Sequence, residues 1–119
     1  MSRRICLALD LVDDAALIES YVRMHEPESV WPAVISHIRA QGVLEMEIWQ
    51  RGGRLFMIVE AEDDYPRPMT GAETATENDR WESLMGALQR PLPGSDPAEK
   101  WSSMRRIFCL ADHATAPRP

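Results

Sequence analysis

Cysteine and long apolar runs are scarce in this chain, which has two cysteines, Cys6 and Cys109, among its 119 residues. Both cysteines lie inside short apolar stretches without CxxC or Cys-His spacing, so neither a zinc site nor a disulfide framework is indicated. We expect both to be buried, reduced thiols that pack as small hydrophobic side chains. No apolar run approaches the roughly 20 residues of a membrane span, and no signal peptide is recognisable. The sequence therefore predicts a cytoplasmic protein.

Basic residues are also few, since 13 Lys and Arg stand against 19 Asp and Glu and give a formal net charge of -6. Nucleic acids and anionic membranes are bound through clustered Lys and Arg, so neither is an expected partner. Hydrophobic residues make up 45% and charged residues 27%, which is typical of a globular domain. We predict a single domain over residues 1–112 and a tail at 113–119.

Apolar periodicity and turn residues predict the element order β, α, α, β, β, α, β. The predicted ranges are a strand at 5–9, a helix from Asp13-Asp14 to about Met24, a second helix capped by Ser29 and ended by Gly42, strands at 44–49 and 55–59, a helix from Asn78 or Asp79 to about Leu88, and a final strand at 104–110. Residues 62–76 have no clean period and read as a loop. Arg51-Gly52-Gly53-Arg54 predicts a hairpin in which both glycines take positive φ.

This order indicates an α+β fold, the ferredoxin-like βαββαβ plan with its first helix split at Pro27. The crossovers place the helices on one face of a four-stranded antiparallel sheet. The other face would stay open, because a chain of this length has too few loop residues to cover it. Pairing of two such sheets into a dimeric α/β barrel would cover both, so we expect a homodimer.

Among three histidines, His25 has the most suggestive position. It stands four residues after Tyr21, so the two side chains share one face of a helix that Pro27 ends. His37 falls on the side of the second helix away from its apolar stripe, and His113 lies in the tail, so both are expected to be exposed. From the residues alone, His25 is either a structural histidine bonded to a nearby carbonyl or a general acid and base at a cavity.

Motifs for covalent, metal or nucleotide chemistry are missing from the sequence. It has no Ser-His-Asp or Cys-His order, no glycine-rich phosphate loop and no carboxylate cluster with metal-ligand spacing. We therefore expect no metal and no cofactor. Proton transfer by a side chain such as His25 remains as the chemistry to consider.

Tryptophan is well represented among the few aromatic residues, at Trp31, Trp49, Trp81 and Trp101. The face of an indole ring packs well against the C–H side of a sugar. Trp31 fits the apolar stripe of the second helix and is expected in the core. Trp49 shares a strand face with Glu45 and Glu47, and this face lines either a cavity between two sheets or solvent.

Several short motifs resemble the L-rhamnose mutarotase family, and especially its subgroup linked to L-fucose breakdown. They occur in the family's order as Tyr21-x3-His25, Val30-Trp31-Pro32, Gly42, Met46-Glu47-Ile48-Trp49, Arg80-Trp81 and Leu84-Met85. The resemblance runs from Arg4 to about Leu110. It implies a dimeric α/β barrel that interconverts the α and β anomers of a 6-deoxy-L-hexose without a cofactor.

The resemblance also implies roles for individual residues. His25 matches the family's proton donor, and Tyr21 and Trp81 match residues that contact the sugar. Glu82 stands where the family has a second tryptophan, and Met46 stands where the rhamnose enzymes tend to have a tyrosine. The implied catalytic residue is thus His25, and the candidate substrate-binding residues are Tyr21, Trp81, Met46, Glu82, Glu47 and Trp49.

Two other functions suit the same features. A cofactor-free monooxygenase on the same dimeric barrel would also use a histidine and a tryptophan-lined cavity, and oxygen uptake would distinguish it. A non-enzymatic dimer that binds a metabolite would show saturable binding without any change in the rate of anomer exchange.

Overall fold

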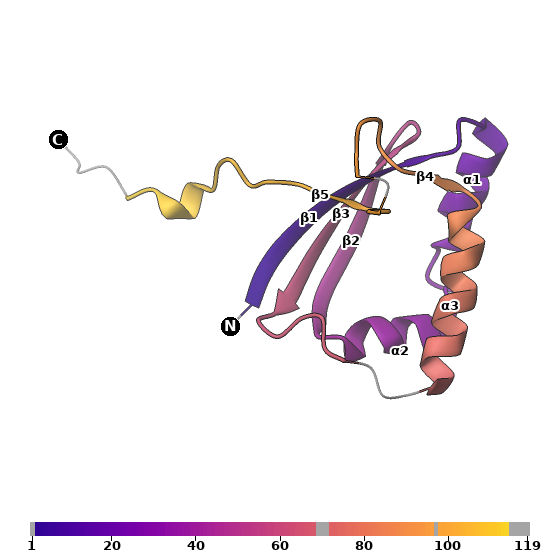
Figure 1. Cartoon of the computed structure of the whole chain (residues 1–119), viewed down its shortest axis with the longest axis horizontal. Coiled ribbons are helices and arrows are strands. Elements are labelled where there is room, and N and C mark those ends of the chain that lie inside the picture. The colour runs from indigo at the N-terminus through magenta and orange to yellow at the C-terminus, as the bar shows by residue number, and fades with distance from the viewer. Residues whose placement is uncertain (1, 69–71, 97, 115–119) are drawn as a thin grey trace.

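Figure 1 shows the computed structural model, which describes residues 2–68, 72–96 and 98–114. Its elements are β1 (Ser2–Leu11), α1 (Ala15–Met24), α2 (Pro32–Ala40), β2 (Val43–Arg51), β3 (Arg54–Glu62), α3 (Ala72–Gly86), β4 (Gln89–Arg90), β5 (Ser102–Ser103) and the 3-10 helix η1 (Leu110–Asp112). The predicted α+β class is confirmed, and so is the succession of the first six predicted elements, from β1 to α3. No helix in this described part of the chain is long and apolar enough to cross a bilayer.

The sheet is antiparallel and has the strand order β2-β3-β1-β4, with β5 also paired to β1. The three helices lie on one side of it (Figure 1). This is the ferredoxin-like arrangement that the sequence predicts. Because neighbouring residues of a strand point to opposite faces, Leu9 and its partner Leu55 face the helices and are almost fully buried, at 0% and 1% exposure.

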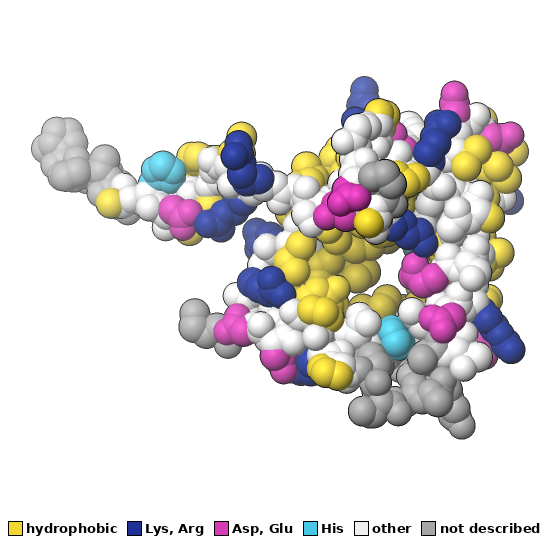
Figure 2. All heavy atoms as spheres, in the orientation of Figure 1, with side chains coloured by type: hydrophobic (Ala, Val, Ile, Leu, Met, Phe, Trp, Pro, Cys, Tyr) yellow, Lys and Arg dark blue, Asp and Glu magenta, His cyan; other side chains and the backbone are white. Residues whose placement is uncertain are grey.

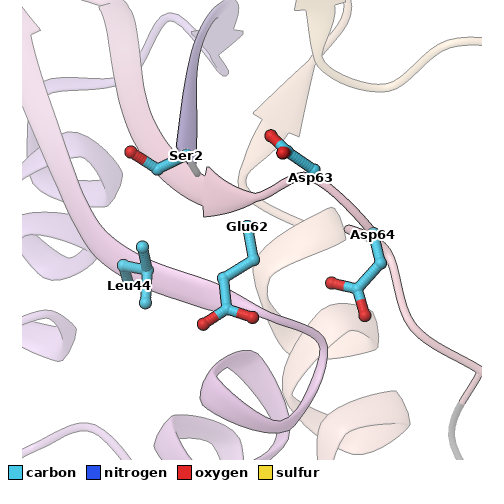
Figure 3. Close-up of a pocket in the computed structure, with 5 residues that line it drawn as sticks. All are labelled: Ser2, Leu44, Glu62, Asp63 and Asp64. Atoms are coloured by element: carbon cyan, nitrogen blue, oxygen red, sulfur yellow. The ribbon is translucent and has the colours of Figure 1, made fainter.

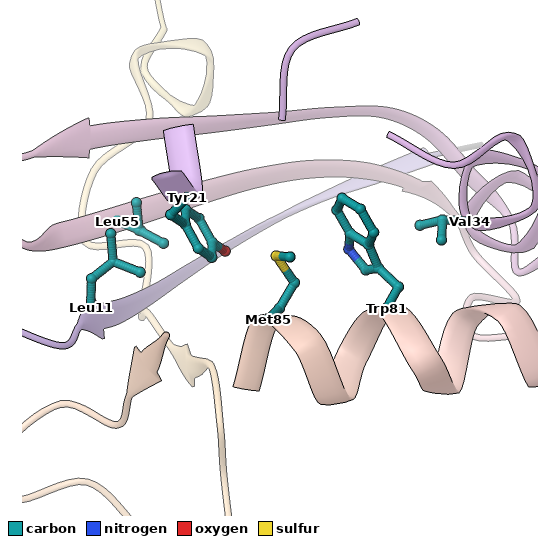
Figure 4. Packing of buried hydrophobic residues seen from close by; sticks show 6 residues of the cluster. All are labelled: Leu11, Tyr21, Val34, Leu55, Trp81 and Met85. Carbon is teal, nitrogen blue, oxygen red and sulfur yellow. The ribbon is translucent and has the colours of Figure 1, made fainter. Parts of the chain in front are cut away.

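The main core lies between the sheet and the helices (Figure 4), and its buried members are Leu11, Tyr21, Val34, Leu55, Trp81 and Met85. Met85 and Trp81 project from α3 toward the strands in this view. Truncating a buried tryptophan to alanine costs about 3–5 kcal/mol in proteins generally, so Trp81 is a major contributor to the packing of α3.

The ends of α1 are as predicted, and they position the residues of interest. The carboxylate of Asp14 accepts hydrogen bonds from the backbone N–H groups of Ala16 and Leu17, at 2.9 and 3.1 Å. Such an N-cap satisfies two donors that have no partner within the helix. At the other end, His25 is the C-cap residue with φ of -99°. The helix therefore carries Tyr21 and His25 on its last turn.

The cap of α2 differs from the prediction. The N-cap is Trp31, which makes no side-chain capping bond, and Pro32 is the first helical residue. Ser29 instead lies in the preceding turn, where its N–H donates to the carbonyl of Glu26 at 2.8 Å. The fixed φ of proline begins the helix without a polar cap. Gly42 follows the helix with φ of +105°, in agreement with its predicted role as terminator.

The hairpin between β2 and β3 is confirmed, but only half of its predicted turn geometry is. Gly52 has φ of +55°, whereas Gly53 does not take a positive φ. The carbonyl of Gly53 accepts a hydrogen bond from the N–H of Leu11 at 2.7 Å. This bond to β1 draws Gly53 into the sheet and away from a symmetric two-glycine turn.

The predicted start of the third helix is wrong, because α3 begins at Ala72 instead of Asn78 or Asp79. The loop assigned to residues 62–76 is correspondingly too long. Alanine and glutamate are good helix formers, and their presence at 72–77 outweighs the missing apolar period there. Part of the predicted loop, at 69–71, lies outside the described residues.

The predicted final strand at 104–110 is also wrong, because β5 ends at Ser103. Ser103 lies opposite Leu7 and Ser102 opposite Ala8. Continuing this register would place Arg106 opposite Arg4, and like charges directly opposite each other destabilise a strand pair. The chain leaves the sheet instead and extends to one side of the domain (Figure 1).

Candidate active site

Four aromatic rings meet beside the end of α1. The ring centroids of Tyr21 and His25 are 4.4 Å apart, and those of His25 and Trp81 are 5.6 Å apart with an interplanar angle of 71°. Trp31 adds a second edge-to-face contact with Trp81, at 5.3 Å and 73°. The four residues come from α1, the start of α2 and α3, so the packing of three helices fixes the imidazole of His25.

A hydrogen bond determines which ring nitrogen of His25 is available. Nδ1 lies 2.7 Å from the backbone carbonyl oxygen of Tyr21. A carbonyl only accepts, so Nδ1 carries the proton and the neutral ring keeps a lone pair on Nε2. Nε2 has no hydrogen-bond partner among the described residues, and the side chain is half-buried. The ring can therefore take a proton at Nε2 and return it.

The phenol of Tyr21 is held by a residue that the sequence did not identify. Gln89 of β4 donates from Nε2 to the Tyr21 hydroxyl oxygen at 3.0 Å. Burial, more than any other influence, raises the pKa of Tyr21 above its ordinary value of 10.0, the Gln89 bond lowers it, and the negative charge of Glu82 raises it. Tyr21 is thus a neutral hydroxyl group at physiological pH, able to donate its proton to a ligand.

No sequence signal singled out Gln89, because β4 has only two residues and its pairing with β1 is a tertiary contact. Its carbonyl oxygen Oε1 is buried without a hydrogen-bond partner in the described part of the chain. Buried amide oxygens normally have partners. The amide nitrogen of Gln89 is thus hydrogen-bonded to Tyr21, whereas its amide oxygen has no partner among the described residues.

The molecule is hollowed between the sheet and α3, and hydrophobic side chains form the floor of this hollow (Figure 2). The same two elements enclose Tyr21, Trp81 and Met85 (Figure 4). The aromatic cluster around His25 thus lies between the sheet and α3, where the hollow opens. An apolar cavity with a few polar groups is the usual form of a small-molecule site.

The candidates on β2 lie on two different faces of the sheet. Met46 is opposite Val59, packs against a second core cluster and is half-buried on the helix side. Glu47 is opposite Ile58, on the face that the helices leave open. Trp49 lies on this open face too, is 61% exposed and donates from Nε1 to Glu47 at 3.3 Å. Met46 therefore lies on the side of the sheet that carries the helices and His25, whereas Glu47 and Trp49 lie on the other side.

Glu82 follows Trp81 in α3 but lies on the surface. Its carboxylate pairs with Lys100 at 3.1 Å, and its side chain is 52% exposed. Its charge still acts on the Tyr21 phenol. The structure thus brings together His25, Tyr21 and Trp81, with Glu82 at the outer margin of the group.

The prediction that His37 is exposed is wrong, because only 7% of its surface is accessible. It lies one turn after the buried Val34 in α2, so the buried side of this helix is wider than the stripe read from the sequence. Nε2 of His37 lies 3.2 Å from the amide nitrogen of Gln41. An amide N–H donates in this contact, and His37 therefore has a structural partner.

Two open depressions lie elsewhere on the surface. One, of about 550 Å³, is lined by Ser2, Leu44, Glu62, Asp63 and Asp64 (Figure 3). The other, of about 390 Å³, adjoins the hairpin and includes Asp10, Arg54 and Arg90. Neither contains an aromatic ring or a predicted site residue. Within the described residues, no group of three or more His, Cys, Asp or Glu is placed to hold a metal ion.

The structure is a small ferredoxin-like α+β domain in which one nitrogen of a half-buried histidine is left without a hydrogen-bond partner, among aromatic rings, in the described part of the chain. The family model for L-rhamnose mutarotase matches residues 4–110. The chain belongs to the L-rhamnose mutarotase family, and it is an isomerase that acts on carbohydrates. The resemblance noted in the sequence is thereby confirmed.

Individual relatives agree with this assignment. The chain is 43% identical over 112 residues to L-fucose mutarotase of Xanthomonas campestris pv. campestris, covering 92% of this chain and 90% of that protein. It is 34% identical over 110 residues to a UPF0734 protein of Dictyostelium discoideum, covering 87% and 86%. The crystal structure of an L-rhamnose mutarotase from Formosa agariphila has the same fold, with a TM-score of 0.64, 16% identity and coverage of 91% and 98%.

Proposed function

We propose that this mutarotase interconverts the α and β anomers of a 6-deoxy-L-hexose, with L-fucose as the first substrate to test, and that His25 transfers the protons. The observation that carries the proposal is the hydrogen bond of His25 Nδ1 to the Tyr21 carbonyl, which leaves Nε2 as the reactive nitrogen. The relative named L-fucose mutarotase, at 43% identity, supports the choice of sugar.

Anomer exchange needs two proton movements. The ring oxygen gains a proton while the anomeric hydroxyl loses one, and the C1–O5 bond opens to give the aldehyde. Rotation about the C1–C2 bond and reclosure from the other face give the second anomer. One imidazole can serve both movements: Nε2 of the neutral ring takes the proton of the anomeric hydroxyl as a base, and the imidazolium gives it to the ring oxygen as an acid while the C1–O5 bond opens. Reclosure runs the same transfer in reverse and regenerates the neutral ring. Such positioned proton transfer contributes about 10²–10⁴-fold.

Tyr21 and Trp81 suit the binding of a deoxy sugar. The hydroxyl of Tyr21 accepts from Gln89 and so has its own hydrogen free to donate to a sugar oxygen. Trp81 offers an indole beside the imidazole, against which the C–H face and the methyl group of the sugar can pack. Met46 supplies apolar surface on the sheet side. Glu82 is a candidate for hydroxyl contact at the margin.

A homodimer is part of this proposal. The open face of the sheet carries Trp49 opposite Phe56 and Glu47 opposite Ile58, and none of the helices α1, α2 and α3 of the described residues covers it. Trp49 is 61% exposed, and exposed apolar surface of this kind marks an interaction site. Dimerisation would place Glu47 and Trp49 in the interface, on the face of the sheet opposite to His25, so they are candidates for contacts between subunits. The free thiols Cys6 and Cys109 support a reducing, cytoplasmic location.

Magnetisation-exchange NMR tests the function directly. The two anomeric protons of L-fucose and of L-rhamnose resonate separately, and the transfer of saturation between them reports the exchange rate. We expect the purified protein to accelerate exchange of L-fucose above the buffer rate, and of L-rhamnose to a lesser extent. Exchange at the buffer rate for both sugars would refute the proposed substrate class.

A further inference from the structure

Trp101 packs against the same core as the aromatic residues of the candidate site. Its side chain is half-buried and contacts the core cluster of which Tyr21, Trp81 and Met85 are members. It comes from a different part of the chain, at the end of the loop that joins β4 to β5 (Figure 1). A half-buried indole keeps part of its ring surface available for contact with a ligand.

The pairing of β5 with β1 directs Trp101 to the side of the helices. Ser102 of β5 lies opposite Ala8. In the same register, Trp101 comes beside Leu9, which faces the helices and is 0% exposed. Side chains of residues opposite each other in antiparallel strands share one face of the sheet. Trp101 is therefore on the side of the sheet that carries His25.

An ion pair fixes the residue before Trp101 to α3. The Nζ atom of Lys100 lies 3.1 Å from Oε2 of Glu82 and 3.5 Å from the backbone carbonyl oxygen of the same residue. Glu82 directly follows Trp81 in α3. Exposed ion pairs add little to the stability of a fold. This ion pair, however, joins the loop that ends in Trp101 to the helix that carries Trp81, and so limits the movement of one indole relative to the other.

Gln89 occupies the neighbouring place along the same edge of β1. It lies opposite Leu11, two residues after Leu9, so it also points to the helix side. Its amide nitrogen donates to the Tyr21 hydroxyl, and its Oε1 is buried without a partner among the described residues. Aromatic surface beside a few polar groups is the usual lining of a small-molecule site.

The rings of the site differ in their distance from the reacting bond. Among the described residues, His25 has ring contacts with Tyr21 and Trp81, whereas Trp101 makes no ring contact with His25. The imidazole acts at the C1–O5 bond of the sugar, and the C3–C4 bond is the opposite edge of a pyranose ring. A sugar with C1 and O5 at His25 therefore turns its C3–C4 edge away from the imidazole.

We propose that Trp101 packs against the C–H groups at the C3–C4 edge of the sugar, and that the ion pair of Lys100 with Glu82 positions it there. The inference rests on the proposed mutarotation of a 6-deoxy-L-hexose and adds to it a residue that determines specificity. L-Fucose and L-rhamnose differ in configuration at C2 and C4. The C4 hydroxyl is axial in L-fucose, which leaves the C–H groups of C3, C4 and C5 as one apolar patch for an indole. In L-rhamnose this hydroxyl is equatorial and interrupts the edge of the patch, so Trp101 favours L-fucose.

Magnetisation-exchange NMR over a range of sugar concentrations tests the contact, because it gives kcat and KM for each sugar. The variants are Trp101→Ala, Trp101→Phe, Lys100→Met and Lys100→Arg. Arg23→Met is the matched control for Lys100→Met, since Arg23 is also exposed and also forms an ion pair, with Glu19 at 3.7 Å. Urea unfolding shows whether each variant is folded. If Trp101→Ala does not fold, Trp101→Phe and Lys100→Met still decide the question.

We expect Trp101→Ala to raise the KM for L-fucose about tenfold and to leave kcat within about twofold of wild type, because this packing is the same in the ground state and the transition state. The KM for L-rhamnose should rise less, so the preference for L-fucose in kcat/KM should fall. Trp101→Phe, which keeps an aromatic face, should show the same changes to a smaller extent. Lys100→Met should raise the KM for L-fucose about two- to fivefold. Lys100→Arg and Arg23→Met should leave it unchanged.

The outcomes separate this inference from the proposed function. A folded Trp101→Ala variant with the wild-type KM and the wild-type preference between the sugars would overturn the contact and leave mutarotation standing. A lower kcat with both of those values unchanged would show that Trp101 is a packing residue only. Wild-type KM in Lys100→Met would overturn the positioning role of the ion pair.

A wild-type protein that accelerates exchange of neither sugar would refute the proposed function. Isothermal titration calorimetry with L-fucose then tests the contact by itself. Binding of L-fucose that Trp101→Ala does not weaken, or the absence of binding to wild type, would overturn the contact as well.

Discussion

The imidazole Nδ1 of His25 lies 2.7 Å from the backbone carbonyl oxygen of Tyr21, one helical turn earlier in the chain. The last carbonyls of a helix lack intrahelical partners, so this bond serves the end of α1 and the histidine together. It fixes the tautomer of the ring and turns Nε2 away from the main chain. The structural and functional interpretations of His25, which the sequence left open, are therefore compatible.

Asp14→Ala should destabilise the fold by about 0.5–2 kcal/mol, because the N-cap bonds to Ala16 and Leu17 are lost. The effect would be measured as the change in free energy of unfolding in urea. Asp13→Ala is the matched control, since Asp14 is the residue that caps the helix, and it should change stability by less than about 0.5 kcal/mol. Equal effects of the two substitutions would contradict the capping assignment.

Tyr21 should make the fold sensitive to alkaline pH. Its pKa is higher in the folded protein than its ordinary value of 10.0, so the folded state binds the phenolic proton more tightly than the unfolded chain. The resulting stability is fully present below about pH 10 and is lost as the pH rises through the folded pKa. Urea unfolding at several pH values from 8 to 11 should therefore show the stability advantage of wild type over Tyr21→Phe shrinking as pH rises. An advantage that grows in this range would disprove the direction of the shift.

Gln89 should act on catalysis through Tyr21. Tyr21→Phe removes the hydroxyl, and Gln89→Leu removes the donor that orients it. Each substitution should slow anomer exchange. The fold-loss in rate of the double variant should be smaller than the product of the two single fold-losses, because both substitutions remove the same bond. Gln89→Leu should also raise the pKa of Tyr21 further, as seen in ultraviolet titration of tyrosinate, which a purely structural role would not require. Multiplicative rate effects would count against the coupling.

Local rules predicted much of the fold. The Asp14 cap, the end of α2 at Gly42 and the hairpin at Gly52 each depend on a residue type that the backbone requires. The pairing of Tyr21 with His25 follows from helical spacing alone. These features involve neighbours in sequence, and the sequence therefore suffices to locate them.

The errors concern contacts between distant segments. Gln89 reaches Tyr21 across 68 residues, and no periodicity reports such a contact. His37 is buried by the packing of α2 in the folded domain, and its position away from the apolar stripe of this helix gave no indication of that burial. The apolar run at 104–110 has the composition of a strand, but continued pairing with β1 would set Arg106 opposite Arg4, and these like charges repel. The reason that this run leaves the sheet thus lies in the distant strand β1, and the pattern of the run itself does not report it.

His25→Asn tests the account most directly. Asparagine retains an N–H that can donate to the Tyr21 carbonyl but has no group that exchanges a proton as Nε2 does. Magnetisation-exchange NMR with L-fucose should show the enzyme-dependent rate falling about 10²–10⁴-fold in this variant, while circular dichroism and the unfolding midpoint stay near those of wild type. A folded variant that retained the wild-type exchange rate would contradict the role of His25.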